Sequence, residues 1–244
     1  MSPSFSNLRQ PSPATEMLAG AQDIFPLVVG AIPFGIIFGT LAQESGLSFA
    51  GTLAMSAFVF AGSAQFIALG LLASGSSVPL VIITTLVVNL RHLLYAASLV
   101  PYLGHLPQRW KLPIGFWLTD EVYMVAIRRF EATKGPHQPW YYLGAALLMY
   151  GNWQLCTWLG LTAGQMLPNA AGWGLDFAMV ATFIGMVVPY LQHRPMVATV
   201  IVAGVVAIAA HDLPHQLGLM AAALAGIAAG ILADRLQSQG ESHE

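Results

Sequence analysis

One stretch of the sequence combines side chains that could hold a charged ligand inside a membrane: Asn89-Leu-Arg-His-Leu-Leu-Tyr95. It falls near the middle of an apolar segment, residues 78–103, where a charge costs roughly 2.5–3.5 kcal/mol on insertion scales. We therefore expect Arg91 to face the interior of a helix bundle and to contact an anion or a carboxylate. The alternative is a structural role, in which Arg91 clamps backbone carbonyls that a broken helix has freed.

Helical spacing arranges the polar residues of this segment in two neighbouring stripes. The stripes consist of Thr85, Asn89 and His92, and of Thr84, Arg91, Tyr95 and Ser98. Two polar stripes on an otherwise apolar helix predict a wet or ligand-lined cavity, with Asn89, His92 and Tyr95 beside Arg91.

The preceding apolar segment offers a second group of small polar residues. Thr52, Ser56 and Ser63 share one helical face, and Ala61-Gly-Ser-Ala-Gln65 leaves backbone accessible beside a hydroxyl and an amide. A small polar ligand could rest against Ser63 and Gln65. Interhelical hydrogen bonds account equally well for such residues in membrane helices.

Pro33 interrupts the first apolar segment, within Ala31-Ile-Pro-Phe-Gly35. Proline removes one backbone hydrogen bond and kinks a helix, so an opened turn here would offer backbone groups to a ligand. A kink packed against its neighbours is the alternative.

Adjacent carboxylates occur in Thr119-Asp-Glu121, inside a thin apolar segment that could enter the bilayer and return. Burial and mutual repulsion favour a bound proton on one of them, so Asp120 or Glu121 is the predicted proton-coupling residue. The alternative places both at the lipid headgroups, paired with basic residues. The candidates for that pairing are Arg109, Lys111 and Arg128.

Metal and hydrolytic chemistry are poorly supported. His211 and His215 have the spacing of two zinc ligands on a helix, but Pro214 would break that helix and no third ligand is evident. An intramembrane hydrolase using Ser63 or these histidines is therefore an alternative of low weight. No metal and no cofactor is expected, and the sequence predicts no enzyme.

The elements that must position these residues are membrane helices. Of 244 residues, 56% are hydrophobic and 8% are charged, against roughly 25% charged in soluble domains. No Asp, Glu, Lys or Arg occurs between Glu44 and Arg91. The nine Lys and Arg residues are scattered, which argues against a nucleic-acid partner. The single Cys156 lies in an apolar stretch and excludes an internal disulfide.

The sequence thus predicts an all-α, polytopic transmembrane bundle of about seven or eight segments, with broken helices. Residues 1–16 are expected to be a disordered N-terminal tail, 17–233 the transmembrane transport domain, and 234–244 a polar C-terminal tail. The expected segments are 17–42, 48–73, 78–103, 112–127, 140–167, 175–191, 196–210 and 214–233.

Small residues suggest where these helices touch and how the chain arose. Close packing is expected at Gly35/Gly39, Gly160/Gly164 and Gly226/Gly230. A faint repeat, Gly46-Leu-Ser-Phe-Ala50 against Gly174-Leu-Asp-Phe-Ala178, suggests two related halves, a common design among transporters.

Taken in order along the chain, these motifs resemble the AzlC family, the large subunit of bacterial branched-chain amino acid exporters. The resemblance rests on four motifs that occur in this order: Pro33-Phe-Gly35, Ala61-Gly-Ser-Ala-Gln-Phe66, Asn89-Leu-Arg-His-Leu-Leu-Tyr95 and Thr119-Asp-Glu121. Gly151-Asn-Trp153 and Gly174-Leu-Asp-Phe177 are similar to the second half of the family.

The resemblance implies a multi-pass protein of the bacterial cytoplasmic (inner) membrane that exports valine, leucine, isoleucine and methionine. It also implies a separate small AzlD-type membrane subunit as partner. The sequence has no nucleotide-binding motif, so an ion gradient is expected to supply the energy, and protons are the expected ion. A membrane scaffold that transports nothing is the remaining alternative.

Overall fold

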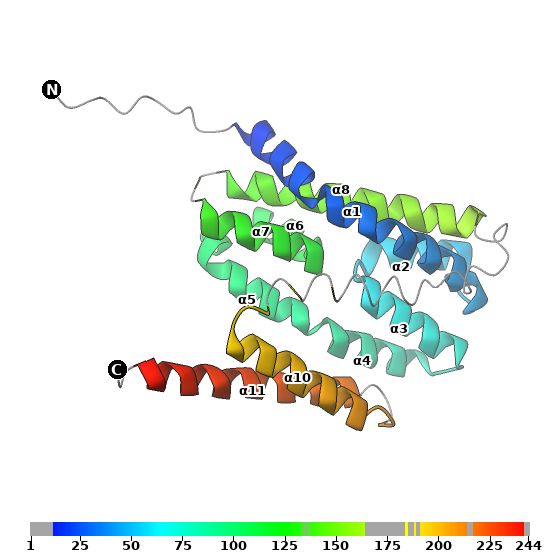
Figure 1. Cartoon of the computed structure of the whole chain (residues 1–244). Helices are drawn as coiled ribbons and strands as arrows, with labels where there is room; N and C mark the ends of the chain where they lie inside the picture. The colour runs from blue at the N-terminus through cyan, green and yellow to red at the C-terminus, as the bar shows by residue number, and fades with distance from the viewer. Residues whose placement is uncertain are drawn as a thin grey trace. The chain divides into compact units, whose positions relative to one another are not determined.

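The structure is a computed structural model that describes residues 12–133, 135, 137–163, 184, 188, 191–213 and 217–241. Among these residues all regular secondary structure is helical, as the sequence predicts. The helices, labelled in Figure 1, are α1 (Pro13–Glu44), α2 (Phe49–Phe58), α3 (Gly62–Ala73), α4 (Val78–Asn89), α5 (Arg91–Leu103), α6 (Gln108–Phe116), α7 (Asp120–Ala132), α8 (Gln138–Ala163), α10 (Arg194–Ala209) and α11 (Leu217–Glu241).

Internal contacts divide the chain into two compact units. Unit 1 comprises residues 1–74 and 89–170, and unit 2 comprises residues 75–88 and 171–244. Unit 1 contains the motifs around Pro33, Ser63, Arg91 and Asp120, and it is described first.

Unit 1 is built on a long seam between α1 and α8, in which glycines let the two backbones approach closely. A Cβ added at Gly39 would meet the Thr157 carbonyl, and one at Gly160 would meet the Ile36 carbonyl. The packing role predicted for Gly39 and Gly160 is confirmed, whereas Gly164 lies outside the described residues. The seam is the rigid frame on which the shorter helices of unit 1 rest.

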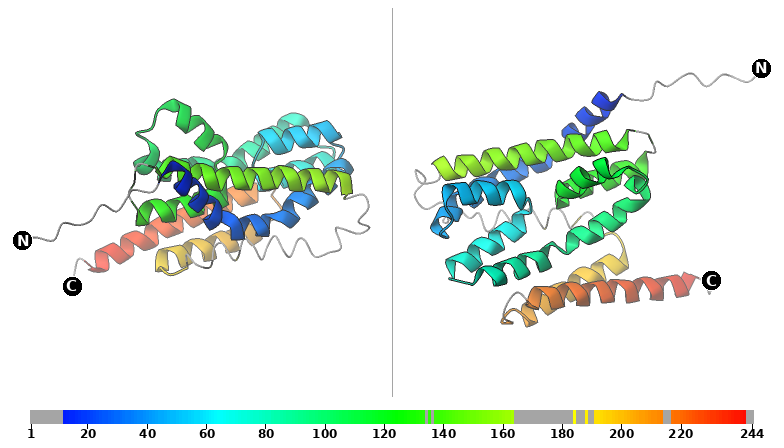
Figure 2. Two further views of the ribbon diagram at one scale, coloured as in Figure 1. Left: turned by 90° about the horizontal axis from the view of Figure 1, so that it is seen from above. Right: turned by 180° about the vertical axis from the view of Figure 1, so that it is seen from behind.

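Helix α1 remains a single helix although it contains Pro26 and Pro33. It is bent, as Figure 2 shows, so the packed kink rather than an opened turn describes Pro33. The helix begins at Pro13 instead of residue 17, because the Ser12 hydroxyl caps it by accepting the Thr15 N–H at 3.2 Å.

Two pairs of short helices form hairpins in unit 1 (Figures 1 and 2). Helices α2 and α3 are joined by residues 59–61, and α6 and α7 by residues 117–119. Segment 48–73, expected to be one span, and segment 112–127, expected to enter the bilayer and return, are therefore both broken near their middle. The longest of these helices, α7, has 13 residues and is only about 20 Å long, short of the ~30 Å hydrocarbon core of a bilayer.

The break between α2 and α3 is held open by side chains that donate to the carbonyls freed at the end of α2. The pairs are Gln154 to Ser56 (2.9 Å), Tyr150 to Ala57 (3.2 Å) and Gln65 to Val59 (2.7 Å). Three amide or phenol donors placed at one helix end stabilise an interruption that apolar side chains could not.

By length and composition, two described stretches could cross a membrane, α1 and residues Val78–Leu103. The expected seven or eight spans are therefore not confirmed. Two of the predicted segments break, at 59–61 and 117–119, and α10 has only 16 residues. The predicted segment 175–191 also lies mostly outside the described residues.

In unit 2, α10 and α11 pack closely through the predicted pair Gly226 and Gly230. A Cβ at Gly226 would meet the Ala203 side chain, and one at Gly230 the Thr199 hydroxyl. Helix α11 continues to Glu241, so residues 234–241 of the expected polar tail are helical. The second copy of the faint repeat, at 174–178, lies outside the described residues.

Large apolar side chains are exposed in both units. Phe58 is 78% exposed, Leu112 72% and Ile208 81%. Such exposure is unfavourable in water and natural against lipid chains.

Candidate functional site

Three helix N-termini of unit 1 meet at Arg91, the first residue of α5. Its Nη1 lies 3.0 Å from Oδ2 of Asp120, the first residue of α7. Its Nη2 donates a hydrogen bond of 2.6 Å to Oγ of Ser63, in the first turn of α3. One guanidinium therefore ties the tips of both hairpins together.

The electrostatics of this junction favour a negative charge. A helix N-terminus presents unpaired N–H groups and a partial positive charge. No side chain caps α3 at Ala61 or α5 at Leu90, whereas Thr119 caps α7 by accepting the Val122 N–H. With the Arg91 guanidinium added, the junction attracts anions, and Asp120 is the anion that occupies it.

The unsatisfied buried side-chain atoms belong to the ion pair or to residues close to it in sequence. In the part of the chain that the structure describes, the buried side-chain atoms without a hydrogen-bond partner are Asn89 Oδ1, Arg91 Nε, Trp117 Nε1 and Asp120 Oδ1. Two of them belong to the ion pair itself, and the other two lie within three residues of it in sequence. A buried polar atom without a partner costs about 1–3 kcal/mol, so these atoms make the surroundings of the Arg91–Asp120 pair the candidate functional site.

The stripe predicted on α5 faces α7. Tyr95 stacks on Tyr123 with ring centroids 4.5 Å apart, and Ser98 Oγ is 2.9 Å from the Tyr123 hydroxyl. His92 lies on the neighbouring stripe, with Nδ1 3.1 Å from the Asn89 carbonyl oxygen. Arg91, Tyr95 and Ser98 thus line one side of the junction, as helical spacing predicts.

Gln65 and Pro33, both expected to contact a ligand, have other roles in this structure. The Gln65 side chain is fully buried: its Nε2 donates to the carbonyls of Met55 and Val59, and its Oε1 accepts the Trp153 indole N–H at 3.1 Å. Its amide therefore fixes the α2–α3 break. Pro33 lies within the unbroken helix α1.

Ser56 follows the interhelical interpretation. Its hydroxyl is 2.9 Å from that of Thr157 on α8, and both residues are fully buried. A hydroxyl pair inside an apolar interface contributes to packing and leaves neither group for a ligand.

Asp120 pairs with Arg91. Within the described residues, it does not pair with the basic residues that were the alternative partners at the lipid headgroups. The described ion pairs contain no contact between Asp120 and Arg109, Lys111 or Arg128. Glu121 follows Asp120 in the first turn of α7 and is partly buried. The carboxylates accordingly lie at the tip of the α6–α7 hairpin.

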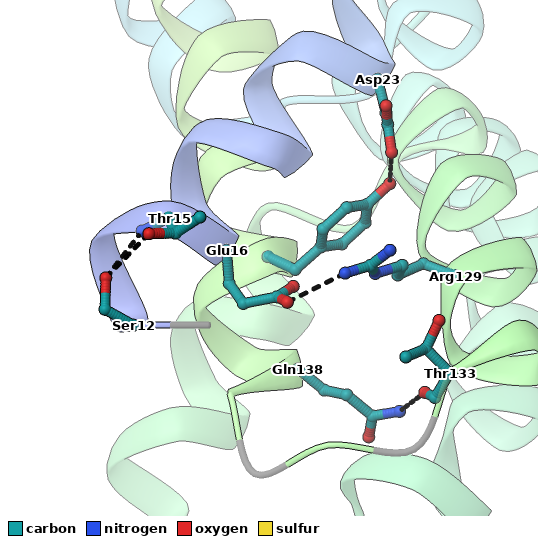
Figure 3. Close-up of polar contacts among 8 residues, drawn as sticks. Ser12, Thr15, Glu16, Asp23, Arg129, Thr133 and Gln138 are labelled. Carbon is teal, nitrogen blue, oxygen red and sulfur yellow. Dashed lines mark hydrogen bonds and ion pairs between the residues drawn. The ribbon is translucent and has the colours of Figure 1, made fainter. Parts of the chain in front are cut away.

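A second polar network was not predicted from the sequence. Glu16 accepts a hydrogen bond of 2.9 Å from Arg129, whose guanidinium lies 5.3 Å from the centre of the Tyr141 ring, and the Tyr141 hydroxyl donates to Asp23 at 2.6 Å (Figure 3). A signal existed: Glu16 and Asp23 are two helical turns apart in an apolar helix, so they share a face.

A metal site finds no support in the described residues, which contain no group of three His, Cys, Asp or Glu side chains able to hold an ion. His211 lies beside Asp212, and His215 is outside the described residues.

Comparisons with known proteins agree with a membrane protein. The family model described as AzlC protein matches residues 26–167. The chain is similar to the inner membrane protein YgaZ of Escherichia coli K12, at 27% identity over 94% of both chains. An uncharacterized membrane protein of Archaeoglobus fulgidus is 35% identical over 83% of this chain and 88% of its own length. A Bacillus subtilis protein named branched-chain amino acid transport protein AzlC is 29% identical over 65% of this chain and 61% of its own length. No solved structure matches the chain.

Proposed function

The chain belongs to the AzlC family of membrane proteins, and from this premise we propose that it is the large subunit of a two-component secondary exporter of branched-chain amino acids. The substrates proposed are valine, leucine, isoleucine and methionine. The protein is proposed to cross the bacterial inner membrane several times. The printed name of the Bacillus subtilis relative supports the substrate class.

The observation that carries this proposal is the Arg91 junction. Transporters commonly hold the carboxylate of a substrate at the N-termini of interrupted helices near the middle of the bilayer. Here three such termini surround Arg91, the residue type best suited to grip a carboxylate with two hydrogen bonds. Ser63 accepts a hydrogen bond from this guanidinium. The proposed substrate site is completed by three residues within four positions of Arg91, which contact one another: Asn89, His92 and Tyr95.

The two hairpins are proposed to enter the bilayer from opposite sides. The α6–α7 hairpin starts and ends beside the N-termini of α1 and α8, since Trp110 contacts Trp140 and Arg129 contacts Glu16. The α2–α3 hairpin begins near the opposite end of α1, after a short turn at Gly46, whose φ of +87° suits glycine. Their tips meet at Arg91, so access from either side would require one hairpin to move.

Charge supports an orientation for this arrangement. Basic residues gather where α6 begins and α7 ends, at Arg109, Lys111, Arg128 and Arg129, whereas the sequence between Arg9 and Arg91 has no Lys or Arg. Because positive loops stay in the cytoplasm, the N-terminus of α1 is proposed to be cytoplasmic. Labelling of single cysteines by a membrane-impermeant maleimide at Ser45 and Gly135 tests this: Ser45→Cys should react from outside, and the reverse pattern would refute it.

Energy is proposed to come from the proton gradient, with Glu121 as the carrier that fits best. Asp120 is the other predicted carboxylate, but it is already compensated by Arg91. In a pH-gradient efflux assay, Glu121→Gln should export leucine without acceleration by the gradient. An unchanged pH profile in both Glu121→Gln and Asp120→Asn would exclude this pair from coupling.

The function is tested by reconstituting the chain in vesicles loaded with radiolabelled leucine, with and without a small AzlD-type subunit. Efflux should require the small subunit, and Arg91→Gln should lower leucine affinity roughly ten- to hundredfold, as expected for loss of a charge-assisted contact of ~1.5–3 kcal/mol. If the folded Arg91→Gln protein binds and exports leucine like the parent, Arg91 is a structural clamp.

A further inference from the structure

The Arg91–Asp120 ion pair has a property that a simple structural clamp lacks. The guanidinium and the carboxylate satisfy each other through one contact, Nη1 to Oδ2, yet each keeps a buried atom without a partner, Nε on Arg91 and Oδ1 on Asp120. Forming such an ion pair removes water from both charged groups, yet neither group forms all the hydrogen bonds that it could.

The four unsatisfied atoms, two in the ion pair and two within three residues of it in sequence, divide evenly into donors and acceptors. Arg91 Nε and Trp117 Nε1 carry N–H groups, whereas Asn89 Oδ1 and Asp120 Oδ1 are oxygens that accept. A ligand that satisfies all four must therefore offer acceptors to one pair and donors to the other. An α-amino acid zwitterion does this, because its carboxylate only accepts and its ammonium group only donates.

We propose that the substrate opens the Arg91–Asp120 ion pair and takes its place, with its carboxylate on Arg91 and Trp117 and its ammonium group on Asp120 and Asn89. This rests on the proposed transport of amino acids, and it changes the role of Asp120 from a predicted proton carrier to a substrate-binding residue.

The exchange conserves charge at the Arg91 junction. In the empty state Arg91 and Asp120 neutralise each other, and in the bound state the two charges of the zwitterion neutralise them separately. Neither state leaves an unpaired charge in the low-dielectric interior, where such a charge is very unfavourable. The empty and the loaded carrier can therefore both close.

The exchange also separates the hairpin tips. Arg91 joins α5 to the tip of α3 through Ser63 and to the tip of α7 through Asp120. A ligand placed between Arg91 and Asp120 pushes α7 away from α5 while the bond to Ser63 stays. Binding and movement of the α6–α7 hairpin are thereby coupled by geometry.

Leucine and its two half-analogues test this assignment on the purified full chain with its small subunit. The parent should bind leucine and should bind 4-methylpentanoate, which lacks the ammonium group, and 3-methylbutylamine, which lacks the carboxylate, at least about tenfold more weakly, because each analogue leaves one partner unpaired. Asp120→Asn should lose leucine affinity and reverse the preference between leucine and 4-methylpentanoate. Glu16→Gln, which removes a carboxylate charge from the ion pair near the other end of α7, should keep the parental order.

A double variant guards against misfolding. Arg91→Gln/Asp120→Asn removes both charges, so it should unfold at a higher temperature than either single variant and still fail to bind leucine. Leucine binding by Asp120→Asn at parental affinity and with parental analogue preference would overturn the assignment to Asp120. Failure of the parent to bind any branched-chain amino acid would instead overturn the proposed function.

Discussion

Helix α7 carries an arginine–carboxylate ion pair near each end, and the two pairs differ in how completely they are satisfied. At its N-terminus, Asp120 pairs with Arg91 among four buried atoms without partners. Near its C-terminus, Arg129 pairs with Glu16 at 2.9 Å, lies over the Tyr141 ring, and belongs to a network that continues to Asp23 (Figure 3). No atom of that second network is among the buried unsatisfied ones of the described residues.

The difference distinguishes a structural pair from the pair that is proposed to bind the substrate. A protein is most stable when every buried polar atom has a hydrogen-bond partner. The Glu16–Arg129 network has this property. A site that must accept a ligand has to keep hydrogen-bonding capacity in reserve, and the Arg91 junction does so. Both pairs would score alike in a count of salt bridges.

The largest expected effect is on stability, at the seam between α1 and α8 that carries the Glu16–Arg129 network. A Cβ at Gly144 would lie against the Met17 carbonyl in the α1–α8 seam, so Gly144→Ala must shift a backbone and should lower stability by about 3 kcal/mol. At the junction, a Cβ at Gly62 would meet only the Trp153 ring at 3.1 Å, and Gly62→Ala should be milder. Unfolding midpoints in detergent measure both, and equal losses would contradict the closeness of the seam.

The next effect tests whether the Glu16–Arg129 pair is purely structural. Glu16→Ala leaves Arg129 without its carboxylate, and because the Arg129 side chain is 32% exposed the loss should be about 2 kcal/mol, below the ~3–5 kcal/mol of fully buried pairs. Leucine affinity should not change. The double variant Glu16→Ala/Arg129→Ala serves as the control and should recover part of the stability. A loss of leucine binding in Glu16→Ala would place this network in the substrate site.

The smallest expected effect compares two indole N–H groups in the same protein. Trp153 donates to Gln65, so Trp153→Phe leaves a buried amide oxygen unpaired and should cost ~1–2 kcal/mol. Trp117 has no acceptor, so Trp117→Phe should leave stability unchanged and weaken leucine binding roughly tenfold. The opposite pattern would mean that the Trp117 N–H is not held in reserve for a ligand. Thermal unfolding and leucine titration on both variants distinguish these outcomes.

The sequence by itself determined that this chain belongs with membrane proteins and that its secondary structure is helical, and it predicted that Arg91 faces polar groups rather than lipid. These conclusions follow from local information, because a charge in an apolar run and the spacing of polar residues on a helix are visible without a fold. The stripe formed by Arg91, Tyr95 and Ser98 was predictable for the same reason.

The tertiary structure alone decided which residues face Arg91. Ser63 and Asp120 are separated from it by 28 and 29 positions, and although both are candidate site residues from the sequence, nothing in it pairs them with Arg91. Gln65 shows the converse: two residues from Ser63 and equally polar, it is used by Trp153 and by the freed carbonyls of α2. Whether a polar side chain is spent on the fold or kept for a ligand depends on partners that only folding brings within hydrogen-bonding distance.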